Sequence, residues 1–196
     1  MRIAVDAMGG DYAPDEIVSG CLLALREDPE LQVILVGRKE DVERVLAEKA
    51  GAELEALRPR IIVHHAEHVV TADDRMRTVL KKKQDNSIVK SVAMVQAGQA
   101  DACVSAGSTG ALVGAAIYIM GRLKGVRRPG VGVPLPSKNG FCFVIDLGSN
   151  ILCKATHLYQ YAEMASIYCE RILKVPTPRV GLINVGTERR DRKSVV

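Results

Sequence analysis

Short apolar runs alternate with stretches of helical periodicity along most of the chain. Apolar runs bounded by glycine or proline predict strands at 2–5, 31–36, 61–63, 102–104, 141–145 and 180–183. Apolar residues spaced three or four apart predict helices around 17–25, 42–46, 88–95, 111–120 and 158–172. Because strands that alternate with helices pair in parallel through right-handed crossovers, the pattern predicts an α/β protein with a mainly parallel sheet.

Four segments stand apart from this alternation. Residues 64–86 have weak periodicity and predict a loop with a short helix, and residues 129–139 predict hairpin-like structure. The helix at 111–120 is apolar on every side, which predicts a central helix covered by other elements. The tail 189–196 is highly charged and offers nothing to pack, so the predicted α/β domain covers 1–188.

Four of the predicted strands run into small, polar turns that contain glycine. These turns are 6–11, 105–110, 146–150 and 184–188. If their strands are parallel in one sheet, all four turns lie at its carboxyl edge, where open α/β folds bind ligands. Turns of this composition that open helices expose backbone N–H groups, so they suit an anion such as phosphate.

Composition narrows the classes of function. The 196 residues are 47% apolar and 26% charged, with a net charge of +4, no Trp and two Phe. The composition is globular, and the scarcity of aromatic rings argues against a stacking surface for nucleic acid. No apolar stretch reaches the roughly 18 residues of a membrane span, no signal peptide precedes the first strand, and the five cysteines lack a spacing pattern. We therefore expect a cytoplasmic protein without a nucleic-acid partner.

The chain lacks the motifs of several cofactor and metal sites. Neither the GxxxxGK[ST] pattern of nucleotide phosphate loops nor GxGxxG after the first strand is present. The metal motif HExxH is absent as well, and His64, His65 and His68 stand at a strand end, where adjacent residues face opposite sides. The sequence predicts no metal site and no cofactor.

The turn 105–110 has the chemistry to hold phosphate or a developing oxyanion, because hydroxyl groups stand beside bare N–H groups. A nucleophilic serine is a sharper alternative, but GxSxG is not matched. A helix cap without a ligand is a third interpretation. The candidate phosphate-binding or oxyanion-binding residues are Gly9, Gly10, Asp11, Ser105, Gly107, Ser108, Thr109 and Gly110.

A second set of residues could take part in catalysis. Asp6 and Asp146 directly follow apolar strands, so each can cap a helix, orient a ligand or move a proton. A cation beside the third turn would offset the charge of phosphate, although a surface position is its alternative role. Cys153 as an acyl-accepting thiol is disfavoured because no histidine is adjacent in sequence. The candidate catalytic residues are Asp6, Asp146, Asn150, Lys154 and His157.

At these same motifs the chain resembles the PlsX family of bacterial phosphate acyltransferases, the fatty acid/phospholipid synthesis proteins. The resemblance runs from Met1 to about Glu188. Its most specific parts are the sequence Asp-Ala-Met-Gly-Gly-Asp at 6–11 and Ser-Ala-Gly-Ser-Thr-Gly at 105–110. Further matching segments are 3–5, 13–14, 82–87, 100–102, 134–136, 138–140, 146–150 and 184–188.

The resemblance implies a three-layer α/β/α fold similar to that of phosphotransacetylases and isocitrate/isopropylmalate dehydrogenases. It also implies transfer of a fatty acyl group from acyl carrier protein to inorganic phosphate, which gives an acyl phosphate for phospholipid synthesis. Phosphate is then the nucleophile, so no acylated serine or cysteine is required. A homodimer with peripheral membrane contact is implied, and neither a metal nor a nicotinamide cofactor is.

The chain departs from the family pattern at three places. Tyr12 stands where the family usually has His, and Leu152 where it usually has Asp. The family also continues well beyond Glu188, whereas the tail 189–196 does not follow its pattern. We therefore expect a truncated or frameshifted chain with weak or no activity of its own.

Two other functions remain open. A phosphotransacetylase-like enzyme would take its acyl group from coenzyme A, and a non-catalytic scaffold would bind acyl carrier protein or lipid enzymes without turnover. A basic cluster suits an acidic carrier protein, and a solvated loop is its alternative role. The cluster consists of Arg122, Lys124, Arg127 and Arg128.

Overall fold

The computed structural model describes residues 1–71, 74, 76–81, 84–138, 140–147 and 153–183, and it divides into two compact units, Met1–Gly121 and Arg122–Val196. The first unit contains the strands β1 (Arg2–Asp6), β2 (Gln32–Gly37), β3 (Ile61–His65) and β4 (Ala102–Val104). Its helices are α1 (Asp15–Glu27), α2 (Lys39–Ala50), α3 (Leu54–Leu57), α4 (Met76–Lys81), α5 (Ser87–Gln96) and α6 (Thr109–Ile119), with short 3-10 turns at Gly51–Glu53 and Arg58–Arg60. The second unit contains β5 (Gly132–Ser137), β6 (Gly140–Ile145) and α7 (Ala155–Arg171).

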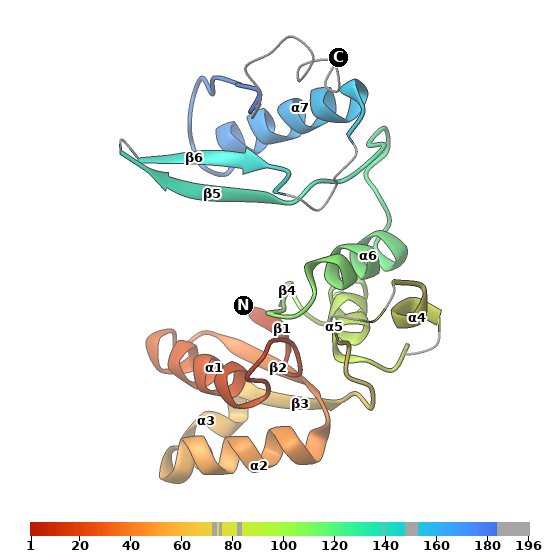
Figure 1. The fold of residues 1–196 in the computed structure, drawn as a ribbon. Coiled ribbons are helices and arrows are strands. Elements are labelled where there is room, and N and C mark those ends of the chain that lie inside the picture. The colour runs from red at the N-terminus through yellow and green to blue at the C-terminus, as the bar shows by residue number, and fades with distance from the viewer. Residues whose placement is uncertain (72–73, 75, 82–83, 139, 148–152, 184–196) are drawn as a thin grey trace. The chain divides into compact units, whose positions relative to one another are not determined.

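The four strands of the first unit form one sheet in the order β3-β2-β1-β4 (Figure 1). Every neighbouring pair is parallel, and the register sets Asp6 opposite Val36 and Val5 opposite Val104. The carboxyl ends of β1, β2 and β4 therefore lie at the same edge of the sheet. This confirms the predicted parallel sheet for the first unit.

Helices cover both faces of this sheet because its central strands alternate between two cores. Val5 and Leu35 belong to a core shared with α1 and α2, whereas the neighbouring Ala4 and Ile34 belong to a core shared with Met94 of α5. Near-continuous apolar strands are typical of a parallel sheet buried on both faces. The predicted α/β/α layering is confirmed for this unit.

The predicted strand at 141–145 forms, but its predicted place in the parallel sheet is wrong. It is β6, which pairs antiparallel with β5 in a separate two-stranded sheet. The short connection forces this pairing, because only antiparallel strands can be joined by so few residues. Gly140, the first residue of β6, adopts φ +118°, a conformation that favours glycine. The hairpin-like structure predicted at 129–139 is confirmed in part: β5 lies within this range, whereas its partner strand β6 follows it.

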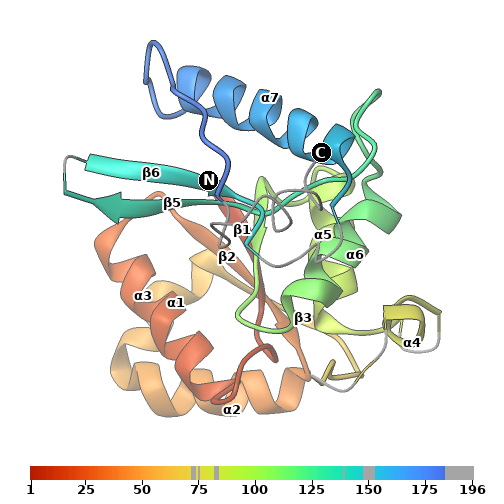
Figure 2. The ribbon, with the colours of Figure 1, turned by 45° about the horizontal axis from the view of Figure 1, so that its top comes forward.

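Helix α7 packs on this hairpin (Figure 2), where the rings of Phe143 and Tyr168 stack with centroids 4.9 Å apart. The predicted helix at 158–172 is confirmed in type, with Tyr161 and Cys169 buried. Residues 180–183, by contrast, form no strand. The turn that was expected to follow them lies outside the described residues.

The prediction that the helix at 111–120 is covered on every side is wrong. In α6 the small residues Ala111 and Ala115 are buried together with Ile88 and Val92 of α5. Tyr118 on the same helix is 62% exposed. A helix without charged residues has no polar face to mark its exposed side, so the sequence pattern could not show which side faces the neighbours.

Adjacent leucines on α1 test how much the core stabilises the first unit. Leu22 is 1% exposed and Leu23 is 54% exposed. We expect Leu22→Ala to lower the free energy of unfolding by about 2–5 kcal/mol, because it removes buried methyl groups and leaves a cavity. The matched change Leu23→Ala should cost no more than about 0.5 kcal/mol. Urea unfolding followed by circular dichroism measures both, and equal losses would contradict the assigned helix face.

Candidate functional site

The site begins at the end of β1, where Asp6 is 1% exposed. Its Oδ1 accepts a hydrogen bond from the backbone N–H of Met8 at 3.1 Å, so the carboxylate closes its own turn. Its Oδ2 accepts a hydrogen bond from Ser105 Oγ at 2.6 Å. Since Ser105 follows β4, this bond ties together the turns after two adjacent strands.

Two glycines approach each other beside this hydrogen bond. The hydroxyl oxygen of Ser105 also accepts a hydrogen bond from the N–H of Gly107 at 3.0 Å. A Cβ on Gly9 would lie 2.4 Å from Asp6 Oδ2 and 2.8 Å from the nitrogen of Gly107. No side chain fits there, so glycine at position 9 is required by the close approach of the two turns.

The second turn leads directly into α6. Ser108 is the N-cap of this helix, and its Oγ accepts a hydrogen bond from the N–H of Ala111 at 3.3 Å. Thr109 and Gly110, the first two residues of the helix, are exposed. The N–H groups of a helix's first turn have no acceptor within the helix, so these two point toward any anion bound at its end.

The structure therefore brings the predicted residues of the first two turns together. Gly10, at φ +102°, lies against Ala106 of the second turn. Asp11 is exposed next to this contact. Sequence reasoning missed the bond between Asp6 and Ser105. The signal that could have found it is an acidic residue and a hydroxyl residue placed directly after two predicted strands.

The remaining candidates that the structure describes belong to the second unit. Asp146 Oδ1 accepts a hydrogen bond from the N–H of Val131 at 3.4 Å. The backbone N–H of Lys154, the N-cap of α7, donates to His157 Nδ1 at 3.3 Å. Lys154 and His157 thus form a helix cap together. Asn150 lies outside the described residues.

Two cysteines have thiols that resist ionisation. Burial raises the pKa of Cys21 to about 11. Burial, followed by the negative charge of Asp6, raises the pKa of Cys103 on β4. A thiol that stays protonated is a poor nucleophile, so neither is suited to carry an acyl group.

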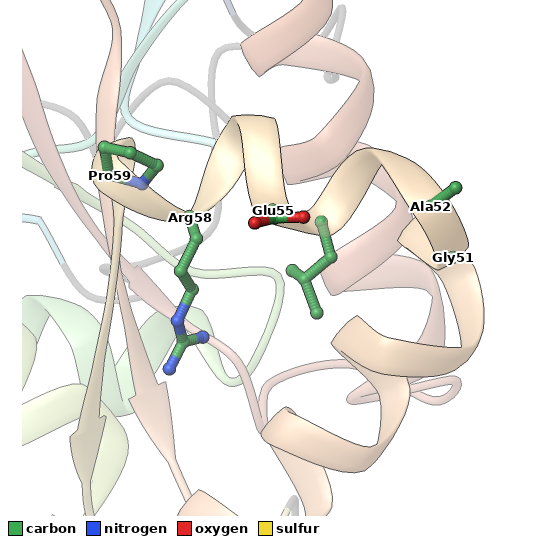
Figure 3. Close-up of a pocket in the computed structure, with 6 residues that line it drawn as sticks. Gly51, Ala52, Glu55, Arg58 and Pro59 are labelled. Atoms are coloured by element: carbon green, nitrogen blue, oxygen red, sulfur yellow. The ribbon is translucent and has the colours of Figure 1, made fainter.

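A hollow of about 700 Å³ lies elsewhere in the first unit (Figure 3). It is lined by residues between 51 and 59, which lead into the amino end of β3. In a parallel sheet this is the opposite edge from the turns after β1 and β4. The guanidinium of Arg58 in this hollow is already paired with the carboxylate of Glu43 at 2.7 and 2.9 Å. The hollow therefore is not part of the site.

Two features are absent from the part of the chain that the structure describes. No group of three or more His, Cys, Asp or Glu side chains is arranged there to hold a metal ion. No helix in the same described ranges is long and apolar enough to cross a membrane.

The buried parallel sheet and its two joined turns define an α/β protein whose polar turns meet at the carboxyl edge of the sheet, the edge at which open α/β folds bind ligands. A family model described as fatty acid synthesis protein matches residues 1–195, and the chain belongs to this family. The chain is 41% identical over 189 residues to a phosphate acyltransferase of Bacillus cytotoxicus, and 45% identical over 186 residues to one of Ectopseudomonas mendocina. These matches cover 96% and 95% of the chain but 54% of each relative, so the chain spans about half their length.

A glycine-to-alanine pair tests the close approach of the turns. We expect Gly9→Ala to destabilise the first unit by about 1–3 kcal/mol, because the new methyl group would overlap Asp6 and Gly107. Gly20 on α1 has no heavy atom within 4 Å of its Cβ position. Gly20→Ala should therefore stabilise by about 0.4–1 kcal/mol. Thermal unfolding of both variants decides, and a Gly9→Ala protein as stable as the parent would contradict the geometry.

The alkylation rate of Cys103 tests whether the charge of Asp6 raises the pKa of this thiol. We expect Asp6→Asn to lower the pKa of the Cys103 thiol, because it removes the negative charge that disfavours the thiolate. Iodoacetamide should then alkylate Cys103 faster at pH 8, as measured by mass spectrometry of its peptide. Cys21, whose pKa is raised by burial alone, is the internal control and should not change. Faster alkylation of both thiols would indicate general loosening instead.

Proposed function

We propose that the protein transfers a fatty acyl group from acyl carrier protein to inorganic phosphate, which produces an acyl phosphate for phospholipid synthesis. The observation that supports this most is the hydrogen bond between Asp6 and Ser105. It holds two glycine turns against each other and leaves the start of α6 open to an anion. The family to which the chain belongs and the names of its relatives point the same way.

In this proposal phosphate binds at the amino end of α6. The N–H groups of Thr109 and Gly110 and the hydroxyl of Thr109 donate to its oxygens. The oxygen of Ser108 already accepts from Ala111, so its own hydrogen is available to donate as well. Each of these donors forms no hydrogen bond within the helix, so it is available to the anion.

Asp6 of the first turn and Ser105 of the second turn support this binding without contacting the anion. Ser105 gives its hydrogen to Asp6 and accepts from Gly107, so all three groups are engaged with one another. Asp6 is almost fully buried, and both of its carboxylate oxygens accept hydrogen bonds within the two turns. We infer that Asp6 and Ser105 are positioning residues, and that Gly9, Gly10 and Asp11 form the facing wall.

The reaction then needs no side-chain nucleophile. A phosphate oxygen attacks the carbonyl carbon of the thioester, and the tetrahedral oxyanion forms beside the amino end of α6, whose dipole favours negative charge. The carbon–sulfur bond breaks, the acyl phosphate is released, and the sulfur leaves as the carrier's thiolate. Held in place, phosphate reacts as if at a much higher concentration.

The proposal also includes what the family resemblance implies about further catalytic residues, location and assembly. Asp146, Asn150, Lys154 and His157 are proposed as further catalytic residues. The proposed enzyme acts in the cytoplasm as a homodimer with peripheral membrane contact. It uses neither a metal nor a nucleic acid.

Two hydroxyl groups test where phosphate binds. We expect the double variant Ser108→Ala, Thr109→Ala to weaken phosphate binding at least about a hundredfold, because it removes two hydrogen bonds to a charged group, each worth about 1.5–3 kcal/mol. Isothermal titration with inorganic phosphate measures this on the chain itself. The matched double variant Ser19→Ala, Ser166→Ala removes hydroxyls that bond to carbonyls in α1 and α7. It should bind phosphate as the parent does, and equal binding by both double variants would move the site elsewhere.

The acyl donor separates the proposed reaction from its alternatives. Phosphate-dependent release of thiol from acyl carrier protein supports the proposal. Release from acyl coenzyme A alone favours a phosphotransacetylase-like enzyme. Binding of the carrier without turnover of either donor favours a scaffold.

A further inference from the structure

A short loop at the start of the second unit concentrates the positive charge of the chain. This basic loop, residues 122–128, carries four cationic side chains and no acidic one, so its charge of +4 equals the net charge of all 196 residues. The rest of the sequence is therefore neutral on balance. The cationic residues of the loop are exposed, and they are Arg122, Lys124, Arg127 and Arg128.

The basic loop is held in one conformation by a side chain of α7. Gln160 Oε1 accepts a hydrogen bond from the N–H of Arg127 at 2.9 Å, and its Nε2 donates to the carbonyl of Gly125 at 2.7 Å. The guanidinium of Arg122 donates to the carbonyl of Arg127. These bonds fix the backbone, so less conformational entropy is lost when a partner binds.

The side chains of Lys124 and Arg127 are not used to hold the loop. Neither forms an ion pair with a carboxylate in the described part of the chain. Arg127 instead lines a hollow of about 410 Å³ between the loop and α7, together with Thr156 and Tyr159. A hollow of this size can take a side chain from a partner, and its rim offers a cation and a hydroxyl.

We propose that the basic loop and this hollow form the docking surface for an acidic protein, which in the proposed reaction is the acyl carrier protein. This identity rests on the proposed function. Complementary charge speeds and orients such an encounter, and a preformed loop suits a defined protein surface. A carboxylate of the partner would enter the hollow beside Arg127 and Thr156. A hollow fits a protruding side chain better than it fits the surface of a bilayer.

Charge reversal on the loop tests the docking surface. We expect Lys124→Glu with Arg127→Glu to slow association with acyl carrier protein about tenfold or more at low salt, because attraction becomes repulsion. The control Lys39→Glu with Arg44→Glu makes the same change in net charge on the exposed face of α2. It should change the rate less than about twofold. Biolayer interferometry with immobilised acyl carrier protein, at 50 and 300 mM salt, gives the rates and their salt dependence.

A third variant separates charge from preorganisation. Gln160→Leu keeps every charge but removes both hydrogen bonds that hold the loop. We expect weaker binding with the salt dependence retained. Unchanged binding by the Glu double variant overturns the proposal, as does equal weakening by the α2 control. Charge-dependent binding to anionic lipid vesicles or duplex DNA, without binding to the carrier, also overturns it.

A small acyl donor distinguishes failure of docking from failure of the proposed function. Acyl pantetheine presents the same thioester without the carrier protein and without charge. The docking proposal expects the Lys124→Glu, Arg127→Glu variant to lose carrier-dependent turnover and keep turnover of acyl pantetheine. If the variant loses carrier binding while the full-length parent turns over neither donor, the docking surface is supported and the proposed reaction is contradicted. Normal carrier-dependent turnover by the variant contradicts the docking surface alone.

Discussion

The hydrogen bond from Ser105 to Asp6 is the interaction on which the site depends. It joins the turns after β1 and β4 at 2.6 Å, and its acceptor is a carboxylate, which makes it a strong hydrogen bond. Because the bond draws the two backbones together, position 9 has no room for a side chain. The open end of α6 is placed by the same bond, since Ser108 and the helix follow directly from the turn that Ser105 begins.

Parallel pairing makes this arrangement possible. Parallel strands end at the same edge of the sheet. The polar residues that follow two adjacent strands therefore lie close together. Near-continuous apolar residues such as Ala4, Val5 and Leu35 bury the sheet on both faces. The polar turn residues are then the part of each strand–turn unit that reaches solvent or a ligand.

Local pattern was enough to predict the first unit. Its strands and its main helices follow the apolar spacing, and the meeting of the first two turns follows from parallel order. The place of β6 could not be predicted in this way, because an apolar strand does not reveal its partner, and the hairpin-like pattern was confined to the residues before it. The exposed side of α6 was hidden for a similar reason, since helix packing there depends on small residues and not on a polar stripe. His157 remains a proposed catalytic residue, and its spacing did not predict that its ring nitrogen also accepts a hydrogen bond from the backbone N–H of Lys154 and caps a helix.

In the proposed site, the amino end of α6, which Asp6 and Ser105 hold in place, binds inorganic phosphate. Titrating phosphate into the ¹⁵N-labelled chain and following its amide resonances tests this most directly. Binding at the start of α6 predicts that the largest chemical-shift changes, saturating with phosphate, occur at the amides of Thr109 and Gly110. Saturating shifts confined to residues of other elements, with the start of α6 unmoved, would contradict it.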